Sequence, residues 1–458
     1  MGSVFNWIEQ LGPAGIVFKA VVAILVTMGL VLSFILLRRA LRQRYLLRRD
    51  QRTLALRKQW DQIVDGTLPP ENWFFNSLDR SIVESMLIDR LEVASPEEAQ
   101  RLRDCLAGSG LLHIRIQEAR SSSGWRQRQA LLCLGRMRTA EVIPAISEAL
   151  DSSDTETRMA AVRGLGRTGL SEAAEPMLER FIEHALDVPE RPLQNSLVHC
   201  CQSNPSVLVP YVRKADDQTR PLLARVLSEI ATPTLEDDLL WLSADANPEV
   251  RASVARALST AKSPQALAVL TALASDPEWF VRLRAAVALG EMRDPRAIPV
   301  LLETLCDPNR YVRLRSAAAL AQMDDHLQKI VHLATKSRDR YALQALLSEM
   351  ERSGAILKLL KALSDPKQRK GASAALLEGL RAGTQRMLLN ALVSHPDWRV
   401  RTAVARLLAD SGETRLIEPV EKAAALASSE REKRISLWVV QQLRAGKSSS
   451  VLLHKESA

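Results

Sequence analysis

One phrase of the sequence occurs twice in succession. Residues 276–290 read DPEWFVRLRAAVALG, and residues 307–321 read DPNRYVRLRSAAALA. An Asp followed by a Pro is typical of a helix start, because the Asp side chain accepts a hydrogen bond at the N-cap and Pro needs no amide hydrogen at the first helical position. We therefore expect a helix with Asp276 as its N-cap, Pro277 at its first position and Gly290 as its C-terminal cap.

The spacing of the apolar residues in this phrase predicts a helix with one buried face. Val281, Ala285, Ala288 and Leu289 recur at helical intervals, which places them on the same side of the helix. A second helix is expected in DPRAIPVLLETL, residues 294–305, before the next Asp-Pro pair. We therefore predict that each repeat unit consists of two short helices joined by tight turns.

The interval between the two copies of this phrase extends through much of the chain. We count from Leu134 in steps equal to the distance from residue 276 to residue 307. Every step but one reaches a Leu, and at the exception Ser196 stands beside Leu197. The leucines are Leu134, Leu165, Leu227, Leu258, Leu289 and Leu320. A further copy of the pattern appears in residues 395–420. We predict an all-α chain, an α-solenoid of about ten to twelve helix pairs between residues 80 and 442.

The repeated pattern resembles a known family. D-P-x-x-x-V-R-x-x-A-A-x-A-L-G followed by D-P-R-A-I-P-x-L is similar to the bacterial HEAT repeat of the subtype found in phycobilisome-lyase proteins. The resemblance is clearest over residues 125–325 and extends to about residue 442. It implies an α-solenoid, in which helix pairs stack because one pair cannot bury its apolar face alone, and whose curved face is a long binding surface.

A second feature of the sequence is an uncharged apolar run. Residues 20–37 read AVVAILVTMGLVLSFILL. A helix of this length spans about 27 Å, close to the thickness of a bilayer's hydrocarbon core. A cleaved signal peptide carries its positive charges before the apolar run, whereas here they follow it. We expect an uncleaved transmembrane helix over residues 13–37, and the alternative is a buried hairpin helix of a soluble protein.

The net charge of +9 is concentrated just after this run. Residues 38–58 hold nine Arg or Lys and a single acid, Asp50, so the rest of the chain is nearly neutral. The positive-inside rule then predicts a single-pass protein of the inner membrane, with its N-terminus outside and its solenoid in the cytoplasm. Six arginines are expected to lie at the membrane surface, near anionic headgroups: Arg38, Arg39, Arg42, Arg44, Arg48 and Arg49.

These features divide the chain into six segments. Their order is a short extracytoplasmic N-terminus, the transmembrane helix, a basic juxtamembrane helix and linker, a helical N-terminal cap, the HEAT-repeat solenoid and a flexible tail. Their predicted bounds are 1–12, 13–37, 38–79, 80–124, 125–442 and 443–458.

The sequence contains no catalytic or metal-binding motif. Its seven histidines are not in metal-ligand spacing, and no glycine-rich phosphate loop or nucleophile elbow occurs. His199, Cys200 and Cys201 are adjacent, but neighbouring helical residues point in different directions, so we expect a structural role. Five scattered cysteines fit a reducing compartment. We therefore expect neither an enzyme nor a cofactor.

Arginines and aromatic residues at one edge of the repeats are the candidate partner-binding residues. Two interpretations are open for the arginines: a partner surface, or a ladder of hydrogen bonds between repeats. For the aromatic residues the alternatives are hot spots for a partner or packing against the preceding turn. The candidates are Arg251, Trp279, Arg282, Tyr311, Arg313, Trp398 and Arg401.

The function expected from these features is a membrane-anchored scaffold or adaptor that binds protein partners at the inner face of the membrane. The resemblance suggests service to envelope or exopolysaccharide machinery. The alternative is a lyase-like or regulatory subunit of an enzyme complex. Nucleic acid is not an expected partner, because a nearly neutral solenoid lacks the positive surface that phosphate binding requires. Gly29 and Ser33 form a small-xxx-small step, through which the anchor helices can self-associate.

Overall fold

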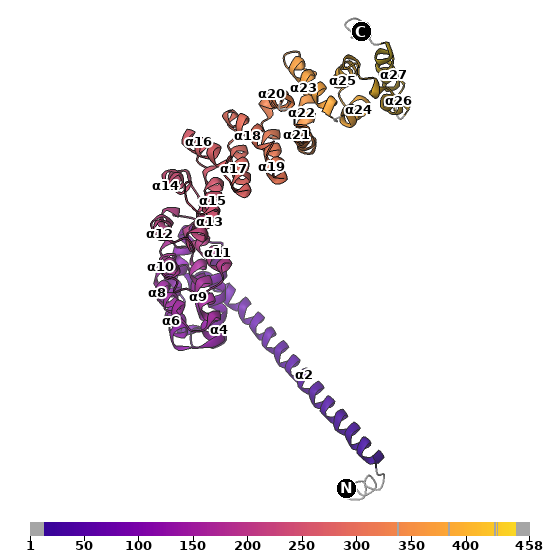
Figure 1. The fold of residues 1–458 in the computed structure, drawn as a ribbon. Coiled ribbons are helices and arrows are strands. Elements are labelled where there is room, and N and C mark those ends of the chain that lie inside the picture. Colours follow the sequence, from indigo (N-terminus) through magenta and orange to yellow (C-terminus); the bar gives the residue numbers. More distant parts are fainter. Residues whose placement is uncertain (1–12, 337–338, 383–384, 426, 428, 446–458) are drawn as a thin grey trace, which may run out of the picture. The chain divides into compact units, whose positions relative to one another are not determined.

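The chain folds into helices joined by short turns (Figure 1). The computed structural model describes residues 13–336, 339–382, 385–425, 427 and 429–445, and within them it has no β-strand. The all-α prediction is therefore confirmed. The chain forms two compact units, Met1–Ala173 and Ala174–Ala458, and each is described by itself.

The first unit begins with one long helix, which is followed by shorter helices. Helices α6 and α7 pack together, as do α7 and α9, and α8 packs against α9. The bounds are α2 (Pro13–Lys58), α3 (Trp60–Val64), α4 (Ser77–Leu91), α5 (Pro96–Gly108), α6 (Leu111–Ser121), α7 (Gly124–Arg136), α8 (Ile143–Glu148) and α9 (Thr155–Thr168).

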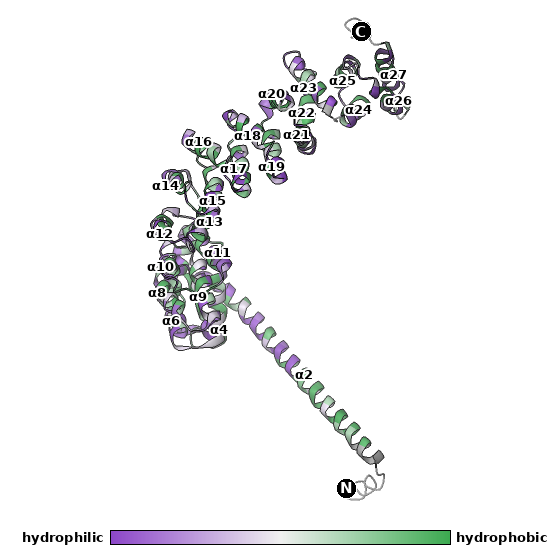
Figure 2. Cartoon of the chain, viewed as in Figure 1, coloured by the Kyte–Doolittle hydropathy of each residue, from purple (hydrophilic) through white to green (hydrophobic). Residues whose placement is uncertain are grey.

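Helix α2 runs without a break from the apolar segment into the basic segment. It has 46 residues, and Figure 2 shows its hydrophobic part followed by a largely hydrophilic one. Its far end is attached to α4: Leu56 is buried, and Arg52 donates two hydrogen bonds of 2.8 Å to the buried carboxylate of Asp79. The basic segment therefore continues the apolar helix without a break as far as Lys58.

The second unit contains the helices α10 to α27. The bounds are α10 (Glu175–Ile182), α11 (Glu190–Cys201), α12 (Val209–Lys214), α13 (Arg220–Ile230), α14 (Glu236–Leu242), α15 (Pro248–Leu258), α16 (Pro264–Leu273), α17 (Trp279–Met292), α18 (Ile298–Thr304), α19 (Arg310–Ala321), α20 (Leu327–Lys336), α21 (Arg340–Ser353), α22 (Ala355–Ala362), α23 (Arg369–Ala382), α24 (Gln385–Ser394), α25 (Trp398–Asp410), α26 (Ile417–Ala425) and α27 (Glu430–Ala445).

Alternate helices of this unit pack side by side. Helices α13, α15, α17, α19 and α21 form one row, in which each contacts the next, while α14, α16 and α18 pack against α15, α17 and α19 respectively. Stacked helix pairs of this kind form an α-solenoid. In the described residues, α4 to α27 are 24 helices, which agrees with the expected ten to twelve pairs.

The predicted buried face of α17 is confirmed. Val281, Ala285, Ala288 and Leu289 are all almost fully shielded from solvent. Small side chains at two of these positions allow neighbouring helices to approach closely, while Val and Leu fill the space between them. The core of the repeats is therefore built from Ala, Val and Leu.

The start of α17 lies two residues later than expected. Its N-cap is Glu278, and its first residue is Trp279. Asp276 instead accepts a hydrogen bond from the Glu278 amide at 2.9 Å and binds the guanidinium of Arg251. The expected cap is therefore wrong, because the Asp276 carboxylate holds the turn before the helix and links it to the preceding repeat.

The expected C-terminal cap of α17 is also wrong. The helix continues past Gly290 to Met292, and the left-handed cap residue is Arg293, with φ 55°. Gly290 lies inside the helix and faces Ala319 of α19. The missing side chain of Gly290 allows α17 and α19 to pack closely, and Gly290 does not end the helix.

The second helix of the same repeat starts where it was expected. Asp294 accepts a hydrogen bond from the Arg296 amide at 2.8 Å, with Pro295 at the first position. The first turn, Pro295–Ala297, is a 3-10 helix that leads directly into α18.

Candidate functional site

Arginines at one repeat position link successive helix pairs of the second unit. Arg251 donates from Nε and Nη2 to the two carboxylate oxygens of Asp276, at 2.7 and 2.9 Å. Arg282 donates in the same way to Asp307, at 2.6 and 3.0 Å. In both cases Nη1 donates to two backbone carbonyls of the turn before the arginine's own helix, at 2.9 to 3.0 Å. Each guanidinium therefore ties its own turn to the turn of the next repeat.

The two ion pairs of this ladder are largely buried. The arginine side chains are 15% exposed and the aspartate side chains are 5% exposed. The hydrogen bond to Asp276 raises the pKa of Arg251. Burial pushes the pKa of Asp276 upward, but the hydrogen bonds from Arg251 and from the Glu278 amide outweigh it, so that this pKa lies below its ordinary value. Both groups are therefore charged and paired at neutral pH.

Two further candidate arginines bind backbone carbonyls of their own turns. Arg313 donates to the carbonyls of Asp307 and Pro308, at 2.7 and 3.0 Å. Arg401 donates to the carbonyl of His395 and to the carboxylate of Glu432. Hydrogen bonds within and between repeats, one of the two interpretations of these arginines, therefore exist in the structure. Their role in binding a partner stays a prediction.

Trp279 and Tyr311 are exposed at the starts of neighbouring helices. Trp279 is the first residue of α17 and is 42% exposed, and Tyr311 is the second residue of α19 and is 52% exposed. Their ring centroids are 6.1 Å apart, with the planes at 34°. Phe280 packs edge-on against Trp279 at 6.0 Å. Large aromatic side chains in this position bury much area when a partner covers them.

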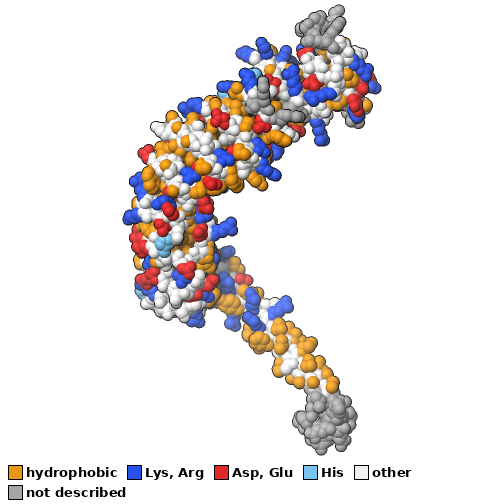
Figure 3. All heavy atoms as spheres, viewed as in Figure 1, with side chains coloured by type: hydrophobic (Ala, Val, Ile, Leu, Met, Phe, Trp, Pro, Cys, Tyr) orange, Lys and Arg blue, Asp and Glu red, His pale blue; other side chains and the backbone are white. Residues whose placement is uncertain are grey.

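Further apolar residues extend this aromatic pair along both helices. Leu283 of α17 is half-buried, and Leu314 of α19 is 45% exposed. Figure 3 shows hydrophobic side chains together with Lys and Arg over this part of the second unit. We call Trp279, Phe280, Leu283, Tyr311 and Leu314 the α17–α19 patch.

Exposed arginines border the α17–α19 patch, and sequence reasoning missed them. Arg284 and Arg315 occupy equivalent positions in successive repeats, and both are exposed. The guanidinium of Arg310 lies 5.1 Å from the centre of the Tyr311 ring, a cation–π contact. The signal was present in the phrase VRLR, which occurs twice. In both copies the first Arg binds the turn before its own helix, and the second Arg is exposed.

The structure does not bring Trp398 together with this patch. Trp398 begins α25 and is half-buried, and the guanidinium of Arg431 lies 3.9 Å from the centre of its ring. This contact is with α27 and not with the turn before Trp398, so the role of Trp398 in binding a partner stays a prediction.

The six candidate membrane-surface arginines lie on α2. All of them are exposed, and they follow directly on the apolar part of the same helix: Arg38, Arg39, Arg42, Arg44, Arg48 and Arg49. By length and composition, one helix of the described residues is able to cross a membrane, and none of its apolar window is buried. The alternative of a buried hairpin helix is therefore not what the structure has.

The histidine and cysteine residues form no metal site in the described part of the chain. Cys200 and Cys201 are fully buried, and burial raises the pKa of the Cys201 thiol to about 12. A ring nitrogen of His199 lies 2.7 Å from the Asn195 carbonyl oxygen. These contacts agree with a structural role for the three adjacent residues.

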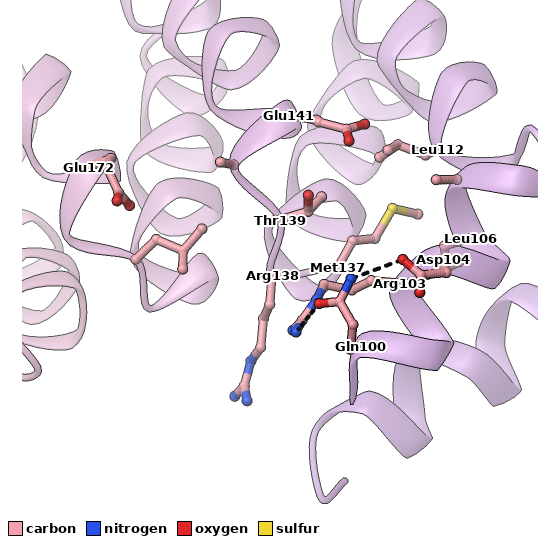
Figure 4. A pocket seen from close by; sticks show the side chains of 13 residues that line it. Gln100, Arg103, Asp104, Leu106, Leu112, Met137, Arg138, Thr139, Glu141 and Glu172 are labelled. Carbon is pink, nitrogen blue, oxygen red and sulfur yellow. Dashed lines mark hydrogen bonds between the residues drawn. The ribbon is translucent and has the colours of Figure 1, made fainter. Parts of the chain in front are cut away.

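A cavity of about 360 Å³ with both polar and apolar lining residues lies in the first unit. Figure 4 shows side chains from α5, from the turn after α7 and from Glu172 around it. Its charged lining residues are Arg103, Asp104, Arg138, Glu141 and Glu172. Gln100 accepts from Arg103 and donates to Asp104, so part of this lining is already hydrogen-bonded.

Comparison with known proteins identifies the repeats. Residues 113–190, 205–289 and 271–351 match the model for HEAT repeats. No curated protein matches the sequence. The HEAT-repeat resemblance of the sequence is thus confirmed over these residues.

Solved structures with similar chains have low sequence identity and low TM-scores. An engineered protein is 19% identical, and the match covers 84% of this chain and 99% of that one, with a TM-score of 0.30. Yeast importin-β (Kap95p) is 13% identical, with 82% and 64% covered and a TM-score of 0.36. The CpcE–CpcF complex of phycocyanin lyase from a Nostoc species gives 22% identity, 48% and 90% coverage and a TM-score of 0.21. The HEAT-repeat match and the packing of the helices, and not these structures, show that the chain is an all-α protein whose helix pairs include HEAT repeats and stack as an α-solenoid.

Proposed function

We propose that the chain is a scaffold that binds a partner protein and holds it at a membrane. The solenoid supplies the binding surface, and the apolar part of α2 supplies the anchor. Concentrating a partner near a membrane raises its effective concentration there without any new chemistry. The chain itself is not an enzyme in this proposal, and it needs no cofactor.

The observation that carries the proposal is the character of α2. Its apolar residues 20–37 are exposed and pack against nothing in the described residues, although a soluble protein buries such a stretch. A bilayer is the environment that removes this surface from water. The arginines after it spread over more than half of the helix circumference, which fits a helix that leaves the membrane upright better than one that lies on its surface.

The orientation follows from the same arginines. Positive residues flank the cytoplasmic end of a membrane helix, so the N-terminus lies outside the inner membrane and the solenoid inside. Because α2 continues as far as Lys58 and is bonded to α4 through Arg52 and Asp79, the first repeats are held at a set distance from the bilayer. The partner is then a component of membrane-bound machinery, with envelope or exopolysaccharide assembly as the candidate.

A charge placed in the apolar segment tests the anchor. Leu25→Arg with Leu30→Arg should release the chain from membranes that have been washed with alkaline carbonate, because each Arg costs about 3 kcal/mol at the centre of a span. The matched control is Leu47→Arg with Leu54→Arg, two equally exposed leucines of the same helix outside the span. This control should stay in the membrane.

Two results would contradict the anchor. Either the wild-type chain is released by carbonate, or both double variants stay in the membrane to the same extent. The orientation has its own test, in which a fluorescent protein fused to the C-terminus should fold and fluoresce, whereas a periplasmic alkaline phosphatase fused there should be inactive.

A second candidate function is a lyase-like or regulatory subunit of an enzyme complex. The cavity of the first unit favours it, since Asp104, Glu141 and Glu172 place three carboxylates around one space. In that case Glu141→Gln with Glu172→Gln would abolish the activity of the complex while the partner still binds. A scaffold predicts that this variant behaves like the wild type.

A further inference from the structure

We propose that the α17–α19 patch binds an acidic amphipathic helix of the partner protein. This inference rests on the proposed scaffold function, and it names the surface and the chemistry of what that surface holds. It is carried by the apolar residues of the patch and by the arginines around them.

The apolar residues form a strip on corresponding faces of two neighbouring helices. Phe280 and Leu283 are three residues apart on α17, and Tyr311 and Leu314 are three residues apart on α19, so each pair lies on one face of its helix. The two pairs occupy equivalent positions in successive repeats. The contact between the rings of Trp279 and Tyr311 joins the two faces.

This strip lies on the opposite side of the helices from the core. Val281 and Val312 are completely buried at the positions between, whereas Trp279, Tyr311 and Leu314 are each about half exposed. The apolar residues of the patch are therefore not needed to fill the interior of the solenoid. Adjacent exposed apolar side chains with charged residues around them are typical of a protein-binding site.

The charge around the patch selects the partner. Arg284 and Arg315 are exposed, as is Arg256 of the neighbouring helix α15, and none of the three guanidinium groups has a hydrogen-bond or ion-pair partner among the described residues. Arg251 and Arg282 differ from them, because their guanidinium groups already donate to Asp276, to Asp307 and to backbone carbonyls. Free guanidinium groups bind carboxylates in a planar, two-bond geometry, so the surface favours Asp and Glu.

The spacing of α17 and α19 favours a helix as the bound element. Neighbouring packed helices lie about 10 Å apart, and apolar residues at i, i+4 and i+7 of a partner helix extend over about 10 Å. Such a helix can place one apolar residue beside each aromatic residue of the patch, while acidic residues on its flanks reach the arginines.

The C-terminal tail of the same chain does not fit this surface. Residues 446–458, which lie outside the described residues, contain Val451, Leu452 and Leu453 but only one acidic side chain, against Lys447 and Lys455. A segment of this charge is repelled by the free arginines. The tail therefore lacks the acidic residues that the free arginines favour, and we assign the surface to a partner protein.

Two synthetic helices test the chemistry of the patch. They share one Leu-rich face and carry either Glu or Lys on the other face, and their binding to the full-length chain in lipid nanodiscs is followed by fluorescence anisotropy. We expect the Glu helix to bind about tenfold or more tightly than the Lys helix, because like charges oppose the Lys helix. Arg284→Glu with Arg315→Glu should reverse this order, and Trp279→Ala with Leu314→Ala should weaken both peptides.

The matched control is Arg386→Glu with Arg406→Glu, which reverses two exposed arginines on α24 and α25. This control should leave the preference for the Glu helix unchanged. The inference is overturned if the Glu helix does not bind, if both peptides bind equally, or if the control variant shifts the preference as much as the patch variant. Circular dichroism should show the same helicity for all variants.

Crosslinking in the cell separates this inference from the proposed function. A photo-crosslinking amino acid replaces Leu314 in one chain and Trp241, an exposed aromatic residue of α14, in another. We expect an adduct at 314 whose crosslinked peptide is acidic and apolar. An adduct at 241 without one at 314 overturns the inference and leaves the scaffold standing, whereas no adduct at either site counts against both.

Discussion

Gly290 of α17 faces Ala319 of α19 so closely that a Cβ atom on residue 290 would lie 2.6 Å from the Ala319 Cβ. Carbon atoms that are not bonded to each other do not approach this closely, so any side chain at residue 290 has to push the two helices apart. The close approach of α17 and α19 sets the spacing of Phe280 and Tyr311 on the opposite side. The interior of the repeat therefore controls the geometry of the surface patch.

Gly290→Ala should destabilise the second unit. Overpacking of this kind costs about 1–3 kcal/mol. The measurement is the midpoint of urea unfolding followed by circular dichroism. Gly108→Ala is the control, because it lies at the end of α5 with open space around it and should change stability by no more than about 1 kcal/mol in the stabilising direction. Equal stability of the wild type and Gly290→Ala would contradict the close packing.

Arg282→Met should destabilise the repeats more than loss of a surface ion pair does. It leaves the nearly buried carboxylate of Asp307 without its partner, which costs about 3 kcal/mol. Arg296→Met removes a solvent-exposed pair with Asp294 and should cost clearly less than Arg282→Met, because water screens exposed ion pairs. Thermal unfolding of the two variants gives the comparison. A loss of the same size in both would show that the ladder has no special role.

The ladder also predicts a loss of stability in acid. The pKa of Asp276 in the folded chain lies below its ordinary value, so its stabilising effect is complete above that ordinary value and is lost as the pH falls through the lower one. Unfolding by urea should therefore become easier as the pH falls below the ordinary pKa of an aspartate, about 4. Asp276→Asn should be less stable at neutral pH and less sensitive to acid than the wild type. If stability falls with decreasing pH as steeply in Asp276→Asn as in the wild type, the ion pair of Asp276 is not the cause of the acid sensitivity.

The cysteines predict the order of reaction with a thiol reagent. Cys306 is exposed, whereas Cys200 and Cys201 are fully buried and burial raises the pKa of Cys201 to about 12. At about pH 8, an alkylating reagent should modify Cys306 first and reach the buried pair only after denaturant is added. Peptide mass spectrometry gives the order. Early modification of Cys201 would contradict the packing of α11.

The buried side of the repeats could be predicted from the sequence because it depends on local periodicity. The intervals among Val281, Ala285, Ala288 and Leu289 identified the core face of α17, and the Asp-Pro pair at Asp294 identified the next helix start. Helical spacing decides these features without reference to other repeats, which is why a single phrase was enough to predict them.

The features that depend on neighbouring repeats could not be predicted in the same way. Asp276 was expected to cap a helix but binds Arg251, and Gly290 was expected to end a helix but serves contact with Ala319. In both cases the partner lies in an adjacent repeat, outside the local phrase on which the prediction was based. The arginines at the patch were missed for a related reason. Arg282 has a carboxylate partner in the next repeat and Arg284 has none among the described residues, and the phrase VRLR does not show this difference.

The central claim is that the solenoid holds a partner protein at the membrane, and quantitative affinity capture from native membranes tests it most directly. Full-length wild-type chain is compared with the Trp279→Ala, Leu314→Ala variant and with the Arg386→Glu, Arg406→Glu control, all at equal amounts. We expect one or a few membrane-associated proteins in near-stoichiometric amounts with the wild type and the control, and a loss of about tenfold or more with the patch variant. No stoichiometric protein with any of the three chains would contradict the claim.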